Sequence, residues 1–184
     1  MVRWIWLAGW LAIAGWSCGI GGAESALPDA ASPASGSRPP NISVRDLNGA
    51  SHHLLSDEHR VVLLHFWATW CPHCRAEIPK LTEIYRRWGA SDVTVLAISV
   101  DDDLSHLSRF VHANQLPYPV IAQSESPERI ADQFHVWGIP TTLLIDRNGL
   151  IVARFEGESD LVDTVAKLLK TSHASGSLVS EVEP

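Results

Sequence analysis

The amino-acid sequence predicts an α/β protein, a three-layer arrangement in which helices cover both faces of one mixed central sheet. Residues 61–67 and 93–100 are short, nearly continuous apolar runs of the length typical of strands buried on both faces. Segments with the apolar spacing of helices follow these runs, and strands that alternate with helices imply a sheet between helical layers. A tight turn near the C-terminus joins two further strands, so antiparallel strands are also expected.

The strands expected outside the two buried runs form two hairpins. The first hairpin turns at Asn48-Gly49, a dipeptide that strongly favours a two-residue turn. The second hairpin turns at Arg147-Asn148-Gly149. Together the hairpins supply strands at residues 42–47, 51–55, 141–145 and 150–155.

Four helices are expected, at residues 72–88, 104–114, 127–135 and 159–170. Pro72 suits the first turn of the first helix, where its missing N–H has no partner to lose. Pro79 lies inside that helix and is expected to bend its axis. Asp103 is the expected N-cap of the second helix. The elements therefore follow in the order β, α, β, α, α, β, β, α after the N-terminal hairpin.

The two ends of the chain differ from its middle. Arg3 precedes an apolar run at residues 4–16. A run of this length is more typical of a secretory signal than of a membrane span, which needs about 20 residues. Cleavage near Ala23, lipidation at Cys18 and an uncleaved anchor all stay open. The expected parts are a signal peptide or N-terminal anchor, a flexible linker, a folded domain and a disordered tail, at residues 1–23, 24–38, 39–170 and 171–184.

The composition excludes some classes of partner. The chain has 184 residues, a formal net charge of −7 and 46% apolar residues, which is enough for a packed core. It contains no run of Lys and Arg, so no surface for nucleic acid is expected. Its three cysteines include one closely spaced pair, a pattern that does not suit a scaffold braced by several disulfides.

The pair Cys71 and Cys74 is the strongest chemical signal in the chain. It stands where the first buried strand ends and a helix begins, so the helix N-terminus would stabilise a thiolate at Cys71. A zinc site normally takes a second such pair, which the sequence lacks, and a structural bridge over so small a loop stabilises little. The pair is therefore interpreted as redox-active. Cys71 is the expected nucleophile and Cys74 the resolving thiol, without a metal or other cofactor.

Residues 66–79 read Phe-Trp-Ala-Thr-Trp-Cys-Pro-His-Cys-Arg-Ala-Glu-Ile-Pro and resemble the active-site segment of TlpA-like thiol–disulfide oxidoreductases of the thioredoxin superfamily. Residues 138–141, Gly-Ile-Pro-Thr, resemble the loop that carries a cis-proline beside the disulfide. The resemblance covers about residues 40–170 and implies a thioredoxin-like three-layer sandwich. It also implies a cis bond before Pro140 and a backbone at Ile139 that pairs with an extended substrate, as an added strand would.

Four side chains near the dithiol have an expected role and a simpler alternative. Trp70 either lies at the edge of the substrate groove or simply packs against neighbouring side chains. His65 lies in the buried strand at a position where thioredoxins carry a buried acid, and it is either a satisfied core histidine or a proton relay to Cys74. Glu77 either corresponds to the Glu that often occurs in TlpA-like motifs or simply lies on a solvated helix face. His73 either tunes the redox potential through the Cys71 thiolate or faces solvent.

The expected function is that of an exported thiol–disulfide oxidoreductase that reduces disulfides in partner proteins. The resemblance implies a membrane thiol carrier as electron donor, service in cytochrome c maturation, and a place in the bacterial periplasm or on the outer face of the membrane. The Pro72-His73 dipeptide resembles that of periplasmic disulfide oxidases, so an oxidase or isomerase with the same dithiol stays open. A copper metallochaperone of the Sco type is the remaining alternative, although that family places three residues between its cysteines.

Overall fold

The computed structural model of the chain describes residues 36–54, 60–125 and 129–176. The expected signal or anchor, with Cys18, lies outside these ranges, as does most of the expected linker. Within the described ranges, no helix combines the length and the apolar character needed to cross a membrane.

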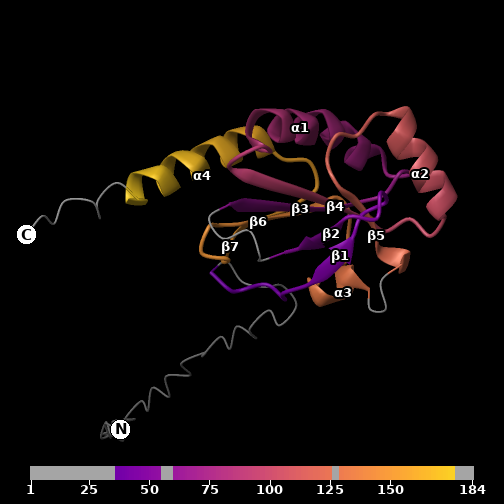
Figure 1. Cartoon of the computed structure of the whole chain (residues 1–184), viewed down its shortest axis with the longest axis horizontal. Helices are drawn as coiled ribbons and strands as arrows, with labels where there is room; N and C mark the ends of the chain where they lie inside the picture. Colours follow the sequence, from indigo (N-terminus) through magenta and orange to yellow (C-terminus); the bar gives the residue numbers. More distant parts are fainter. Residues whose placement is uncertain (1–35, 55–59, 126–128, 177–184) are drawn as a thin grey trace, which may run out of the picture. The chain divides into compact units, whose positions relative to one another are not determined.

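A five-stranded mixed sheet forms the centre of the fold (Figure 1). In spatial order, its strands are β5 (Val120–Ala122), β4 (Val93–Ser99), β3 (Val61–Trp67), β6 (Thr141–Ile145) and β7 (Ile151–Glu156). The middle strand, β3, is parallel to β4 and antiparallel to β6, and all seven of its residues are buried. The predicted mixed sheet is therefore confirmed. The short strand β5, which runs parallel to β4, was not predicted.

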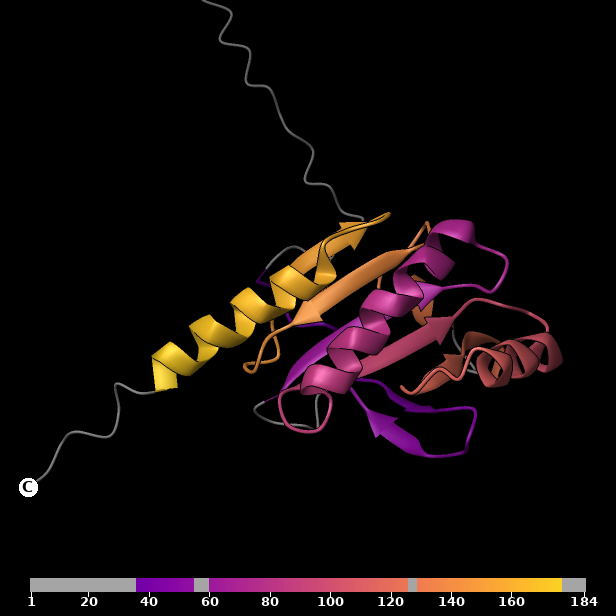
Figure 2. The same cartoon turned by 90° about the horizontal axis from the view of Figure 1, so that it is seen from above.

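Helices cover both faces of this sheet (Figures 1 and 2). The four helices are α1 (Pro72–Trp88), α2 (Leu104–Ala113), α3 (Ile130–Gln133) and α4 (Leu161–Gly176). One apolar core joins α1, α2 and α4 to the first face of the sheet, through Leu81, Leu107 and Val165 among others. The other core joins the second face to α3 and to a separate N-terminal hairpin of β1 (Ser43–Arg45) and β2 (Ser51–His53). The three layers agree with the predicted thioredoxin-like sandwich.

Some element boundaries agree with the sequence-based prediction, and others do not. The bounds of β3 and α1 are those expected, and Asp103 caps α2 by accepting the His106 N–H at 2.9 Å. The third helix was expected from residue 127, yet α3 begins only at Ile130. The predicted start of a disordered tail at residue 171 is wrong, because α4 continues to Gly176. Residues 177–184 of that tail lie outside the described ranges.

The register of the central strands determines where the chemistry lies. Phe66 of β3 pairs with Thr141 at the start of β6. The loop that precedes β6 therefore lies beside the end of β3, where the cysteine pair follows. Two motifs about 70 residues apart in the sequence are brought together by this single antiparallel pairing.

Candidate active site

The cysteine pair lies at the junction of β3 and α1. Cys71 is the N-cap of α1 with extended backbone angles, φ −87° and ψ 114°, and Pro72 occupies the first turn. The two cysteines form a disulfide with their Cα atoms 5.3 Å apart. The Cys74 backbone N–H donates to Cys71 Sγ at 3.2 Å, so the first cysteine sulfur occupies the position of a helix-capping acceptor.

This position decides which sulfur is the more reactive in the dithiol form. The first turn of α1 carries no acidic residue, so nothing there offsets the positive end of the helix macrodipole. A thiolate on Cys71 is stabilised by that field and by the Cys74 N–H. Cys71 is 5% exposed, whereas Cys74 is fully buried. Only the first sulfur can therefore be approached from outside.

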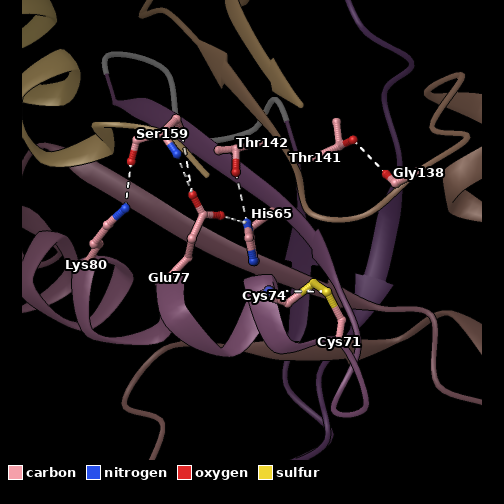
Figure 3. Close-up of polar contacts among 9 residues, drawn as sticks. All are labelled: His65, Cys71, Cys74, Glu77, Lys80, Gly138, Thr141, Thr142 and Ser159. Atoms are coloured by element: carbon pink, nitrogen blue, oxygen red, sulfur yellow. Dashed lines mark hydrogen bonds and ion pairs between the residues drawn. A yellow bond between two sulfur atoms is a disulfide. The ribbon is translucent and has the colours of Figure 1, made fainter. Parts of the chain in front are cut away.

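The loop before β6 forms the second part of the site. The bond between Ile139 and Pro140 is cis, which confirms the geometry that the resemblance implied. Thr141 Oγ1 donates to the Gly138 carbonyl at 2.7 Å, and the Gly157 N–H donates to the Pro140 carbonyl at 2.8 Å (Figure 3 shows the first of these bonds). The backbone groups of Ile139 have no hydrogen-bond partner among the described residues. They are available to an extended peptide.

A groove of about 380 Å³ borders this loop. Trp70, the residue before Cys71, is 67% exposed and lines the groove, and its contact with a substrate stays a prediction. Trp137 lines it from the other loop and is 72% exposed. The remaining walls, which were not predicted, include Val100, Arg129, Asp132 and Val136. Nothing in the sequence around these four residues indicates a groove. Trp137, by contrast, stands directly before the Gly-Ile-Pro motif.

His73 lies on the exposed side of the site. Its side chain is 74% exposed, and its Nδ1 lies 3.3 Å from Glu158 Oε1. Its ion-pairing partner is therefore a carboxylate from the loop after β7. Its influence on the redox potential stays a prediction.

Glu77 is fully buried, so the alternative of a solvated helix face is wrong. Glu77 Oε1 accepts the Ser159 backbone N–H at 3.0 Å, and Lys80 Nζ donates to the Ser159 carbonyl at 2.9 Å (Figure 3). Burial raises the pKa of Glu77, and the Ser159 hydrogen bond and Lys80 act in the opposite direction. The loop before α4 thus holds this carboxyl group one helical turn beyond Cys74.

His65 is also buried, 1% exposed, on the side of β3 that faces α1. Its Nδ1 lies 2.9 Å from Thr142 Oγ1 and 3.8 Å from Glu77 Oε2. Burial lowers the pKa of His65 to about 3, so the ring is neutral at physiological pH. Two of the residues expected to tune the dithiol, His65 and Glu77, are therefore neighbours.

A buried carboxylate anchors the loop that carries the cysteines, and the sequence did not predict it. Asp101 was interpreted as part of a simple strand-to-helix loop, yet it is 4% exposed. Its carboxylate accepts the Thr69 N–H at 2.9 Å, the Thr69 Oγ1 hydroxyl at 2.6 Å and the Ser99 Oγ hydroxyl at 2.7 Å. These bonds fix the end of β3 to the end of β4.

Within residues 36–54, 60–125 and 129–176, no three His, Cys, Asp or Glu side chains are grouped as metal ligands. The copper-chaperone alternative depends on a third ligand beside the two cysteines, and a copper titration is its direct test.

Comparisons with known proteins agree with this geometry. The model of the AhpC/TSA family matches residues 35–154. The thiol-disulfide oxidoreductase ResA of Bacillus thuringiensis is 32% identical over 123 residues, which cover 67% of this chain and 70% of that protein. ResA of Geobacillus thermodenitrificans is 31% identical over 116 residues, which cover 63% of this chain and 66% of that protein. The chain thus spans about two thirds of the length of these curated relatives.

A solved structure supports the same fold. The thioredoxin domain of a thiol-disulfide oxidoreductase from Bacteroides vulgatus superposes with a TM-score of 0.65 at 28% identity. The match covers 73% of this chain and 96% of that domain. The predicted enzyme class, a thiol–disulfide oxidoreductase, is confirmed by the names of these similar proteins.

Proposed function

The chain belongs to the AhpC/TSA family, and from this membership we propose that it is an exported protein-disulfide reductase that works through Cys71 and Cys74. One observation carries the proposal. A disulfide at the N-terminus of α1 lies beside a cis-proline loop whose Ile139 backbone groups are free to pair with a peptide. The relatives named thiol-disulfide oxidoreductases support the reaction type.

The proposed cycle begins with the reduced protein. The Cys71 thiolate attacks a disulfide of a client protein, and one client sulfur leaves as a thiolate. The mixed disulfide between Cys71 and the client is then attacked by Cys74, which forms the Cys71–Cys74 disulfide and releases the second client sulfur. The client gains two electrons and two protons, and the protein must be re-reduced. We propose a membrane thiol carrier for that last step, as the resemblance implies.

The groove gives the client a place to lie. Trp70 and Trp137 are exposed and line the groove. An extended client segment that pairs with the Ile139 backbone would pass between these two tryptophans. Aromatic side chains that remain exposed beside a reactive group are suited to contacts with a partner. The client class that we propose from the resemblance is an exported protein such as apocytochrome c.

Export itself is part of the proposal. A positively charged start and an apolar run at residues 4–16 support a signal peptide or a retained anchor. Lipidation of Cys18 would instead tether the protein at a membrane surface. The corresponding location is the bacterial periplasm or the outer face of the membrane.

Replacing each cysteine tests the assigned roles. We expect Cys71→Ser to lower the rate of disulfide reduction by more than about a thousandfold, because the attacking sulfur is lost. Cys74→Ala should instead accumulate a mixed disulfide with the client, visible as a thiol-sensitive band on a non-reducing gel. Cys18→Ser is the matched control and should change neither result. Full reductase activity in Cys71→Ser would refute the scheme.

A further inference from the structure

Helix α3 and the residues after it form one wall of the groove beside the cysteines. The helix packs on the face of the sheet opposite α1 and α4 (Figure 1). Arg129 and Asp132 line the groove from the helix and its N-cap, and residues 136–139, the Trp137 wall, continue toward the cis-proline. Trp137 itself is 72% exposed, so little packing of its own side chain holds it in place. Its position therefore depends on how the backbone around it is fixed.

The backbone between α3 and Trp137 makes a tight turn. Phe134 is the C-cap of the helix, and His135 after it has φ 50°, in the left-handed region that residues other than glycine rarely adopt. The Val136 N–H closes the turn by donating to the Ala131 carbonyl at 2.8 Å. Carbonyl groups at the end of a helix have no partners within the helix, so this turn needs donors from elsewhere.

Arg154 supplies two such donors from the edge strand β7. It pairs across the strands with Leu143, a residue of the core that also contains α3, which places the Arg154 side chain on the α3 side of the sheet. Nη1 donates to the Phe134 carbonyl at 3.2 Å, and Nη2 donates to the His135 carbonyl at 2.8 Å. Nε donates to Glu156 Oε1 at 3.0 Å, which orients the guanidinium. The Arg154 side chain is 14% exposed, so these bonds are largely shielded from water.

Arginine is suited to this set of contacts in a way that lysine is not. Its planar guanidinium presents five N–H donors in a fixed arrangement, whereas the lysine ammonium is a point charge on a flexible chain. Two bonds to consecutive carbonyls fix the direction of the backbone as well as its position. The Trp137 wall begins at the next residue, Val136, and at its other end the Thr141 hydroxyl donates to the Gly138 carbonyl at 2.7 Å.

We propose that Arg154 is a positioning residue for client binding: its guanidinium holds the Trp137 wall in the conformation that accepts an extended client segment. The inference rests on the proposed function and deepens it, because it separates recognition of a polypeptide from exchange of the disulfide. Without these bonds the wall must be ordered when the client binds, and that entropy cost weakens binding. The attack by Cys71 uses none of the contacts of Arg154.

Two disulfides with the same reacting bond separate recognition from chemistry. One joins thionitrobenzoate to N-acetylcysteine amide, and the other joins it to the cysteine of the acetylated peptide Ala-Phe-Cys-Val-Ala-Ala. The Cys71 thiolate of the reduced full chain, in a Cys18→Ser background, bonds to the cysteine sulfur of the probe, and thionitrobenzoate leaves with the electron pair. Cys74 then releases the probe as a thiol. The absorbance of thionitrobenzoate gives the maximal single-turnover rate and the half-saturating probe concentration.

We expect Arg154→Met to raise the half-saturating peptide concentration at least about fivefold, with the maximal rate and the reaction of the small probe within about twofold of the parent. Arg154→Lys should resemble Arg154→Met, because an ammonium cannot reproduce the two directed bonds. It also provides a second variant should Arg154→Met fail to fold. Arg86→Met removes an exposed arginine from the last turn of α1 and is the matched control, which should change neither probe.

A double-mutant cycle with Trp137→Ala tests whether Arg154 acts through the Trp137 wall. In the Trp137→Ala background, we expect Arg154→Met to weaken peptide binding by less than about twofold. A full effect in that background overturns the inference.

Three further outcomes also decide the matter. A merely structural role of Arg154 would slow both probes equally, and that result overturns the inference, as does parent-like peptide saturation in both Arg154 variants. A parent that does not discriminate between the probes overturns it as well, because no peptide binding would then depend on the wall. A parent that releases no thionitrobenzoate from either probe would instead overturn the proposed function.

Discussion

At the scale of single residues, a difference in exposure assigns distinct roles to the two cysteines. Cys71 keeps 5% of its surface exposed at the helix N-terminus, whereas Cys74 lies in the core against the sheet. A client sulfur can therefore meet only Cys71, and Cys74 can act only inside the molecule. The buried groups His65 and Glu77 are neighbours in the same layer between β3 and α1.

Burial of His65 makes stability depend on pH. Its pKa is about 3 in the folded state and about 6.5 in the unfolded state, so between these values the unfolded state binds the additional proton. The stability gained from a neutral His65 is complete above pH 6.5 and is lost as the pH falls toward 3. As the pH falls from 6.5 to 4, we expect the free energy of unfolding of the parent to decrease by up to about 3 kcal/mol relative to that of His65→Asn.

Urea unfolding of both proteins across this range measures the difference. Burial raises the pKa of Glu77, so Glu77 alone would make the protein more stable on acidification, the opposite sign. The same experiment on Glu77→Gln separates the two contributions. An unfolding free-energy difference between the parent and His65→Asn that does not change with pH would contradict a neutral, buried His65.

At the scale of elements, the loop between β3 and α1 is held by Asp101. Its carboxylate accepts three hydrogen bonds from Thr69 and Ser99, all in the interior. Removing it leaves buried donors without partners, each at a cost of about 1–3 kcal/mol. We expect Asp101→Ala to lower the free energy of unfolding by about 3 kcal/mol or more.

The neighbouring Asp102 is exposed and provides the matched control. Asp102→Ala should change the free energy of unfolding by no more than about 0.5 kcal/mol. Both values come from urea unfolding followed by circular dichroism at one pH. Equal effects of the two substitutions would show that the carboxylate of Asp101 does not anchor the loop.

The elements also show what sequence reasoning can predict here. The bounds of β3 and α1 followed from a continuous apolar run and from helical spacing after Pro72, which are strong local signals. The strand β5 has only three residues, too few to show a period, and it forms because β4 offers it a parallel edge. Helix α4 continues past the last apolar residues to Gly176, where composition alone predicted a tail.

The candidate site was predictable in its cysteines and less so in its surroundings. The spacing of Cys71 and Cys74 and their place before a helix are local properties of the sequence. The cis bond before Pro140 came only from the resemblance, since X–Pro bonds are cis in about 5–6% of cases. The contact between His65 and Glu77 depends on how α1 packs over β3, and no pattern in either segment encodes it.

At the scale of the whole domain, the site is assembled from segments far apart in the chain. The cysteines follow β3, the cis-proline loop precedes β6, and Ser159 before α4 reaches Glu77 from the C-terminal part. The antiparallel pairing of β6 with β3 and the packing of α4 beside α1 bring the three together (Figures 1 and 2). The central claim built on this assembly is that the Cys71–Cys74 dithiol gives electrons to client disulfides.

The equilibrium reduction potential of the Cys71–Cys74 pair tests that claim most directly. The fraction of disulfide is measured across a series of dithiothreitol and glutathione redox ratios at pH 7, in the Cys18→Ser background. A reductase is expected to lie near the thioredoxin value, about −270 mV. A value near that of the strong oxidase DsbA, about −120 mV, would contradict the account and reassign the protein as a disulfide donor or isomerase.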